Sequence, residues 1–215
     1  MSFLTVYRSP REHAIVAFLL AHGAGAGQRH PFIVNRATAL SARGVDVATF
    51  DFPYMEARRK MPDRGPVLHA RYLEAIDAAR RELPSARVLV IGGKSMGGRI
   101  ATEVAAADPE LPVSGLVLLG YPLHPPGRPE RRRDAHLPAL AKPMLFVQGG
   151  RDTFGTADEL APALARVSPS PALHVVAGGD HSFKLSRTDP TAQGAVYEAI
   201  DRVVAEWILA LAGRT

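Results

Sequence analysis

The order of apolar and helical segments along this chain predicts an α/β fold with a mostly parallel, doubly wound sheet of about seven strands. Six runs of strand length are apolar at nearly every position rather than at every second one, which is typical of parallel strands covered on both faces. Helical patterns separate these runs, and this alternation favours right-handed crossovers. With 215 residues, of which 47% are apolar, the chain is expected to form one domain spanning residues 1–215.

The expected elements follow the apolar pattern in order. A weak run at Phe3–Tyr7 is interpreted as an edge strand, and the six stronger runs lie at Ala14–Ala21, Val45–Phe50, Val88–Ile91, Leu116–Leu119, Met144–Val147 and Leu173–Ala177. Helical patterns lie between or after them, at Pro31–Ala42, Pro66–Leu83, Met96–Ala107, Thr156–Val167 and Thr191–Ala212. Apolar side chains recur at helical spacing in the last helix, which is expected to pack one stripe on the sheet. In folds of this kind the functional site lies outside the carboxyl ends of the strands.

The one irregular segment, Tyr121–Lys142, is rich in proline and contains an arginine run. It is too short for an independent cap domain and is expected to be a surface loop with at most one helical turn. The predicted site is therefore open, which suits small acyl groups better than long buried lipid chains.

The first strong apolar run has a second interpretation as part of a secretory signal, because Arg8 and Arg11 precede it and small residues follow it at Ala24–Ala26. The run is short and leads into a glycine-rich loop with a predicted use, so we interpret it as a buried strand and expect a cytoplasmic protein. No apolar run approaches the roughly 18–20 residues of a membrane span, and no membrane partner is expected.

The net charge of +5 and the pI of about 9.9 raise the question of nucleic-acid binding. The arginines are scattered, however, and the one tight run, Arg131–Arg133, lies between Glu130 and Asp134. We interpret this run as a solvated basic loop and expect no nucleic-acid partner. The chain has no cysteine, which excludes disulfides, a thiolate nucleophile and thiolate-bound metal centres but leaves the redox compartment open.

The segment Gly93-Lys-Ser-Met-Gly97 resembles both the end of a phosphate-binding P-loop and a nucleophile elbow. A P-loop requires a glycine at the position of Val88, which instead lies within a predicted strand. An elbow requires a strand before the serine, a helix after it and small residues two positions to either side. Gly93, Gly97 and the flanking patterns meet these requirements, so Ser95 is the predicted nucleophile.

A serine hydroxyl needs a base, and the base needs an acid to orient it. In this architecture the order along the chain is Ser, then Asp or Glu, then His, with each residue after a strand. Asp152 follows the strand Met144–Val147, and His181 is the only one of eight histidines that directly follows a later strand. Asp180 is a weaker candidate for the acid, because neighbours in a tight turn seldom direct their side chains at each other.

The tetrahedral intermediate of acyl transfer needs main-chain donors for its oxyanion. The N–H of Met96, directly after the nucleophile, is one expected donor, and the second is expected from the loop after the strand Ala14–Ala21. Ala24 of the segment His22-Gly-Ala-Gly-Ala-Gly27 is our choice. This loop could also be a dinucleotide fingerprint, but Gln28 stands where the third glycine is required. No cofactor and no metal is therefore expected.

The substrate contacts are less well determined by the sequence. Phe52 and Tyr54 follow the strand Val45–Phe50 and could form an apolar acyl wall or a packed loop, and His124 could face the pocket or be an ordinary loop histidine. Phe154 could contact substrate or pack beside Asp152. Lys94 and Arg99 could bind an acidic substrate group, but a structural ion pair is the favoured interpretation for both.

Together these residues resemble the α/β-hydrolase superfamily. Within it, the chain is similar to a small cap-less group near the dienelactone hydrolases, which includes a testis-expressed protein and the hydrolase-like region of a non-specific-lethal chromatin-complex subunit. The segments that carry the resemblance span most of the chain and are Leu20–Gly27, Gly92–Arg99, Gly120–Gly127, Phe146–Asp152 and Gly179–His181. The resemblance implies an α/β-hydrolase fold without a cap domain and a Ser95–Asp152–His181 triad. Dienelactone hydrolases proper use a cysteine where this chain has Ser95, so their specific activity is not transferred.

The leading hypothesis is a serine hydrolase that cleaves a small acyl ester or thioester through an acyl-enzyme. One alternative is a non-catalytic protein-interaction module on the same fold. A third hypothesis is a cofactor-free perhydrolase or haloperoxidase-type activity, which would use the same triad. The natural substrate and the oligomeric state are not predicted.

Overall fold

The computed structural model describes residues 3–11, 14–186 and 190–213. Its strands form one sheet in the order β1-β3-β2-β4-β5-β6-β7. The edge strand β1 runs antiparallel to β3, and all other neighbours are parallel, as predicted. The strands are β1 (Thr5–Tyr7), β2 (Val16–Ala21), β3 (Asp46–Phe50), β4 (Val88–Lys94), β5 (Gly115–Leu119), β6 (Met144–Gly149) and β7 (Ala172–Val176).

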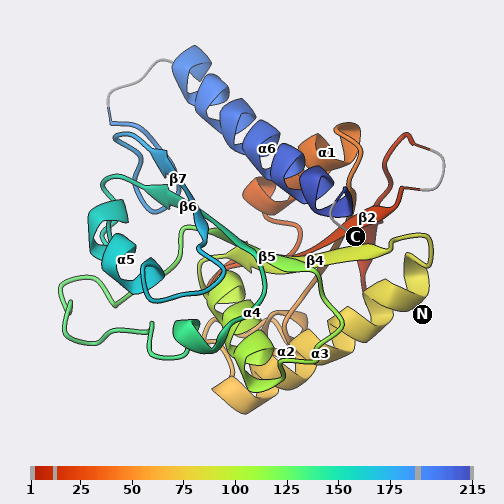
Figure 1. Cartoon of the computed structure of the whole chain (residues 1–215), viewed down its shortest axis with the longest axis horizontal. Coiled ribbons are helices and arrows are strands. Elements are labelled where there is room, and N and C mark those ends of the chain that lie inside the picture. The colour runs from red at the N-terminus through yellow and green to blue at the C-terminus, as the bar shows by residue number, and fades with distance from the viewer. Residues whose placement is uncertain (1–2, 12–13, 187–189, 214–215) are drawn as a thin grey trace.

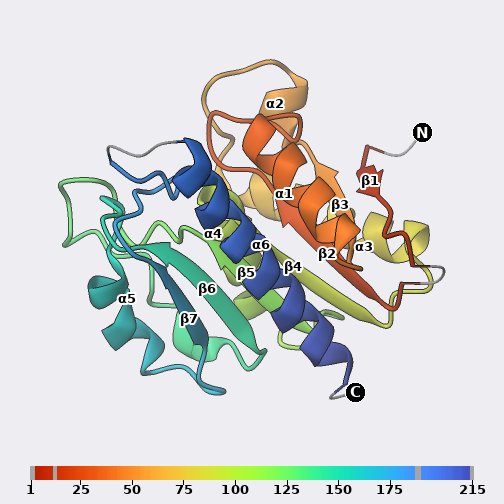
Figure 2. The same cartoon turned by 90° about the horizontal axis from the view of Figure 1, so that it is seen from above.

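Helices cover both faces of the sheet (Figures 1 and 2). One face carries α1 (Pro31–Ala42) and α6 (Pro190–Ala212), and the opposite face carries α3 (Gly65–Glu82), α4 (Met96–Ala107) and α5 (Ala157–Leu164). This is the doubly wound α/β architecture that the sequence predicts.

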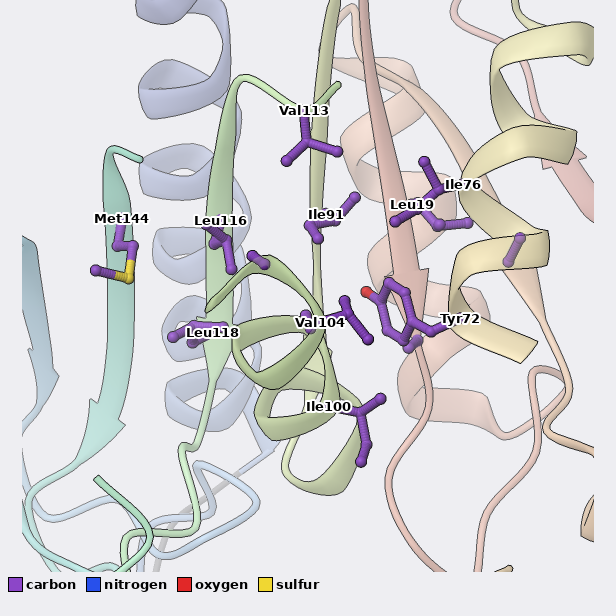
Figure 3. Close-up of a cluster of buried hydrophobic side chains, with 14 of the residues drawn as sticks. Leu19, Tyr72, Ile76, Ile91, Ile100, Val104, Val113, Leu116, Leu118 and Met144 are labelled. Carbon is purple, nitrogen blue, oxygen red and sulfur yellow. The ribbon is translucent and has the colours of Figure 1, made fainter. Parts of the chain in front are cut away.

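Alternation along each strand divides the core into two layers, because successive side chains of a strand point to opposite faces. In β2, Leu19 packs toward α3 and α4, whereas Phe18 and Leu20 pack toward α1 and α6. Figure 3 shows the first layer, where side chains of α3 and α4 meet those of the central strands. The central strands are buried on both faces, which explains why they are apolar at nearly every position.

The structure differs from the expected elements in two places. A short helix, α2 (Pro53–Glu56), follows β3, and its four residues are too few to show a helical period in the sequence. The edge strand β7 leaves Ala172 and Val175 exposed, so the expectation of burial on both faces was wrong for this strand.

The connection from β5 to β6 contains only a single 3-10 turn, Leu137–Ala139, and no cap domain. Among the described residues, no helix combines the length and the apolarity that crossing a bilayer requires.

Candidate functional site

The turn from β4 into α4 holds Ser95 in a backbone conformation that non-glycine residues rarely adopt, with φ 50° and ψ −114°. Its main-chain N–H donates to the carbonyl of Leu119, at a distance of 3.0 Å, which ties the turn to the end of β5. A Cβ atom on Gly97 would lie 2.6 Å from the His22 carbonyl oxygen, so only glycine lets α4 start this close to β2. The predicted elbow geometry is present.

The structure brings the three predicted residues together in one chain of hydrogen bonds. The Ser95 Oγ lies 2.8 Å from His181 Nε2, and His181 Nδ1 lies 2.8 Å from Asp152 Oδ2. Because an ionised carboxylate only accepts, Nδ1–H donates to Asp152, and Nε2 is left to accept the Ser95 proton. The three side chains come from the ends of β4, β6 and β7, as predicted.

Burial, joined by the positive charge of Lys94, holds the pKa of His181 below its usual value, although the hydrogen bond to Asp152 opposes this. The imidazole is therefore neutral at neutral pH, which is the state in which Nε2 can take a proton. The Phe154 ring stacks on His181 with 4.2 Å between the ring centroids. This contact fixes the plane of the imidazole.

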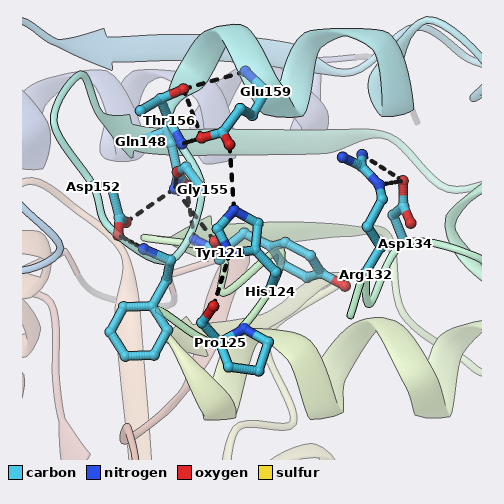
Figure 4. A network of polar contacts seen from close by, with 11 residues as sticks. Tyr121, His124, Pro125, Arg132, Asp134, Gln148, Asp152, Gly155, Thr156 and Glu159 are labelled. Carbon is cyan, nitrogen blue, oxygen red and sulfur yellow. Dashed lines mark hydrogen bonds and ion pairs between the residues drawn. The ribbon is translucent and has the colours of Figure 1, made fainter. Parts of the chain in front are cut away.

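Asp152 is held by a polar network that the sequence analysis did not find (Figure 4). Gln148 Nε2 donates to Asp152 Oδ2 at 3.0 Å, and the Phe154 N–H donates to Oδ1 at 2.8 Å. Gln148 also binds the main chain of Tyr121 and Gly155, and both Gln148 and Asp152 are buried. The signal in the sequence that could have indicated this role is that Gln148 is a single amide side chain at the end of an apolar strand.

Asp180, the weaker candidate for the acid, stabilises the turn in which it lies. Its Oδ1 accepts from the N–H groups of Ser182 and Lys184, at 2.7 and 2.9 Å. Asp180 therefore closes the loop that presents His181, and the orienting position beside the imidazole belongs to Asp152.

The loop after β2 lies against Ser95, since a Cβ on Gly23 would be 3.6 Å from Ser95 Cβ. The buried His22 fixes this loop: its Nδ1–H donates to the Gly23 carbonyl at 2.8 Å, and its Nε2 accepts from the Phe52 N–H at 3.2 Å. Burial lowers the pKa of His22, in keeping with a neutral ring that donates at one nitrogen and accepts at the other. The sequence analysis included His22 in this loop but did not predict this role.

Ala24 and Met96 both line the cavity beside Ser95. Within the described part of the chain, neither main-chain N–H donates to a protein acceptor. Met96 is the first residue of α4, where the helix leaves its N–H groups without intrahelical partners. Both donors are thus free to bind an anionic oxygen near Ser95.

The cavity has a volume of about 880 Å³ and opens onto Ser95, His181 and Phe154. Its apolar wall is formed by side chains that the sequence did not single out, among them Phe32, Ile33, Leu68 and Pro122. Phe154 is the one predicted substrate contact that lines it.

The other three predicted substrate contacts do not reach the cavity. Phe52 and Tyr54 are fully buried, because α2 turns this segment inward and Phe52 packs edge-on against Phe50. The packed-loop interpretation is therefore correct for this segment, and the acyl wall is not formed by it. His124 is also buried, with its Nδ1 on the Pro125 carbonyl and its Nε2 3.5 Å from Glu159 (Figure 4).

The two basic residues beside Ser95 have different surroundings. Arg99 forms the expected ion pair, with Glu103 one turn further along α4. Lys94 does not form the expected ion pair. Its Nζ is buried without a hydrogen-bond partner, and this burial lowers the pKa of Lys94 to about 8. Among the described residues, no group of three or more His, Asp and Glu side chains is placed to hold a metal ion.

Comparisons with known proteins identify the fold. A family model for the alpha/beta hydrolase domain matches residues 14–209. Among solved structures, a dienelactone hydrolase from Anabaena variabilis ATCC 29413 superposes with a TM-score of 0.73 at 22% identity, over 96% of this chain and 90% of that one. An alpha-beta serine hydrolase homologue from Coxiella burnetii gives 0.74 at 16%, over 94% and 89%.

A monoacylglycerol lipase from Paleococcus ferrophilus gives a TM-score of 0.70 at 15% identity, over 97% of this chain and 98% of that one. At these identities the solved structures establish a shared fold, and the family model, which covers most of the sequence, establishes the family. The chain belongs to the α/β-hydrolase domain family, with the cap-less fold of a dienelactone hydrolase.

Proposed function

We propose that this protein is a serine hydrolase that cleaves small acyl esters or thioesters through an acyl-enzyme. The observation that carries the proposal is the chain of two 2.8 Å hydrogen bonds from Ser95 through His181 to Asp152, beside an open cavity. Family membership and the esterase and lipase names among proteins of the same fold support it.

In the first half-reaction, Ser95 Oγ attacks the substrate carbonyl carbon while His181 Nε2 takes the hydroxyl proton. The carbonyl oxygen becomes an oxyanion, which the main-chain N–H groups of Met96 and Ala24 bind. When the tetrahedral intermediate collapses, the bond to the alcohol or thiol breaks and the imidazolium returns the proton to this leaving group. Asp152 stays ionised throughout and stabilises the imidazolium.

In the second half-reaction, His181 takes a proton from water, whose oxygen attacks the acyl-enzyme. Collapse of the second intermediate breaks the bond to Ser95 Oγ and returns the proton to it, which releases the carboxylic acid. The buried amide of Gln148 and the ring of Phe154 hold Asp152 and His181 in place during both steps.

The test is covalent labelling of the purified protein with a fluorophosphonate, followed by mass mapping of the modified residue. We expect stoichiometric labelling of Ser95, none in Ser95→Ala, and turnover of short p-nitrophenyl esters or thioesters by the wild type alone. A folded wild type that labels no more than Ser95→Ala would contradict the proposal and favour a non-catalytic interaction module.

A further inference from the structure

Basic side chains outnumber acidic ones along the cavity beside Ser95. Among the described residues, five basic side chains line it, Arg36, Lys94, Arg99, Arg133 and Lys184, but only one acidic side chain does, Asp63, which pairs with Arg59. Two of the five have counter-ions outside the lining, since Arg36 pairs with Asp201 and Arg99 pairs with Glu103. Lys94, Arg133 and Lys184 form no ion pair within the described part of the chain.

Two of these cations, Arg99 and Arg133, lie near enough to each other for the charge of one to act on the other. Arg99 lies one turn along α4, where its N–H donates to the Ser95 carbonyl at 3.0 Å, and side chains on a helix lean back toward its N-terminus. Arg133 comes from the β5–β6 connection, and its main chain is fixed from both sides. Its N–H donates to the Leu123 carbonyl at 2.8 Å, and its own carbonyl accepts from the Tyr121 hydroxyl at 2.6 Å.

The carboxylates near this pair are occupied by other partners. Glu103 binds both Arg99 and His69, the latter at 2.7 Å. Asp134, next to Arg133 in sequence, pairs with Arg132 (Figure 4) and with Arg166 instead.

Arg133 is thus left without a counter-ion. Within the described residues, its guanidinium makes neither an ion pair nor a hydrogen bond, although the side chain is only partly exposed. Burial and the neighbouring Arg99 lower the pKa of Arg133, although Tyr121 and the Glu103 carboxylate oppose this. A half-desolvated guanidinium with free donors inside a cavity is a binding site for an oxyanion.

We propose that Arg133, assisted by Arg99, binds a carboxylate carried by the substrate, and that the protein is selective for acyl esters with a negative charge close to the scissile carbonyl. This inference rests on the proposed hydrolase function and narrows its substrate class. Arg133, Arg99 and Ser95 line the same cavity, so a substrate whose carbonyl lies at Ser95 can present its carboxylate to Arg133. The carboxylate could belong to the acyl part or to the alcohol part, so the experiment includes both.

The experiment compares matched substrate pairs that differ in charge but not in shape. For the acyl part, the pair is p-nitrophenyl hydrogen succinate and p-nitrophenyl isohexanoate, and for the alcohol part it is p-acetoxybenzoate and p-isopropylphenyl acetate. Each is assayed with the wild type, Arg133→Gln and Arg131→Gln, and Ser95→Ala supplies the background rate. Arg131 is exposed in the same connection and does not line the cavity, so its variant has the same change in net charge.

We expect the wild type to prefer the anionic member of at least one pair in kcat/KM. Arg133→Gln should lower kcat/KM for that ester by about 10- to 100-fold, the range for loss of a charge-assisted hydrogen bond, while its neutral isostere changes little. Arg131→Gln should behave as wild type. The pair that responds identifies which part of the substrate carries the carboxylate.

Neutral esters turned over at rates equal to their anionic isosteres would overturn the inference and leave the proposed function standing. An equal loss on both members of a pair in Arg133→Gln would do the same. If no ester is hydrolysed and Ser95 is not labelled, the proposed function itself is wrong, and this inference is wrong with it.

Discussion

Lys94 is the residue whose surroundings differ most from those expected on a protein surface. Its ammonium is buried without a hydrogen-bond partner, next to Gly120, where a Cβ atom would lie only 2.9 Å from Nζ. It faces the His181 ring, the carboxylates of Asp152 and Asp180, and the Phe183 ring at 5.7 Å. We interpret Lys94 as a positioning residue whose charge adds to the effect of burial in lowering the pKa of His181.

Replacing Lys94 with Met tests this at nearly constant volume. Loss of the positive charge should raise the pKa of His181, and because the neutral imidazole is the active form, the acidic limb of the kcat/KM profile should move to higher pH. The measurement is the pH–rate profile on a neutral ester. An unchanged acidic limb would show that the Lys94 charge does not act on His181.

The same variant should also differ from the wild type in stability. Measuring its unfolding will show at the same time that it folds. The pKa of Lys94 is about 8 in the folded chain against 10.5 for a free side chain, so the unfolded chain binds more protons between these values. Below pH 8 the wild type should therefore be less stable than Lys94→Met, by about 3 kcal/mol at most. The difference should shrink as the pH rises toward 10.5 in urea unfolding.

At the scale of elements, the elbow depends on a contact from α3 that the sequence did not reveal. The Tyr72 hydroxyl donates to the Gly92 carbonyl at 2.6 Å and accepts from the Gly92 N–H at 2.9 Å. It therefore satisfies both main-chain groups of a residue three positions before Ser95, where a Cβ atom would collide with the Val117 carbonyl oxygen at 1.8 Å. Burial raises the pKa of Tyr72, so the hydroxyl keeps its proton.

Tyr72→Phe removes this one oxygen and with it both hydrogen bonds to the buried main chain of Gly92. We expect a loss of about 1–3 kcal/mol in the free energy of unfolding and a lower rate of Ser95 labelling. Tyr7→Phe is the matched control, because the Tyr7 hydroxyl makes no hydrogen bond within the described residues. Equal stability of the two variants would mean that Gly92 finds other partners.

Most of the elements could be predicted from the sequence, because the parallel packing of the strands determines both their apolar composition and the position of the site. Strands covered on both faces are apolar throughout, and the polar residues that follow parallel strands meet at one edge, which is how Ser95, Asp152 and His181 were found. The direction of side chains in the loops follows no such period. This is why the sequence left both an acyl wall and a packed loop open for Phe52 and Tyr54, which α2 turns into the core, and why Gln148 was missed.

At the scale of the whole molecule, one buried ion pair joins distant parts of the chain on the α1–α6 face of the sheet. Arg36 of α1 lies 2.8 Å from Asp201 of α6, and its guanidinium lies over the Tyr197 ring at 4.6 Å. Burial raises the pKa of Asp201 to about 6 in spite of Arg36, so ionisation of the carboxylate is less favourable in the folded chain than in the unfolded chain. The pair links α6 to the helix that follows the loop of Ala24.

Removing one partner and removing both should have opposite consequences. Arg36→Met or Asp201→Leu alone leaves a buried charge without its partner and should lower the free energy of unfolding by about 3–5 kcal/mol at pH 7. The double variant replaces the pair by apolar side chains and should be at least as stable as the wild type. Urea unfolding of all four proteins gives the coupling energy directly.

The pH dependence provides an independent check on the same proteins. Because the pKa of Asp201 is higher in the folded chain than its usual value of 3.8, the folded state binds more protons between 3.8 and 6, and this residue should stabilise the wild type as the pH falls through that window. The double variant lacks the group and should not gain this stability. If the effects of the single variants simply add in the double variant, the two charges are not coupled, and the link between α1 and α6 must come from apolar packing alone.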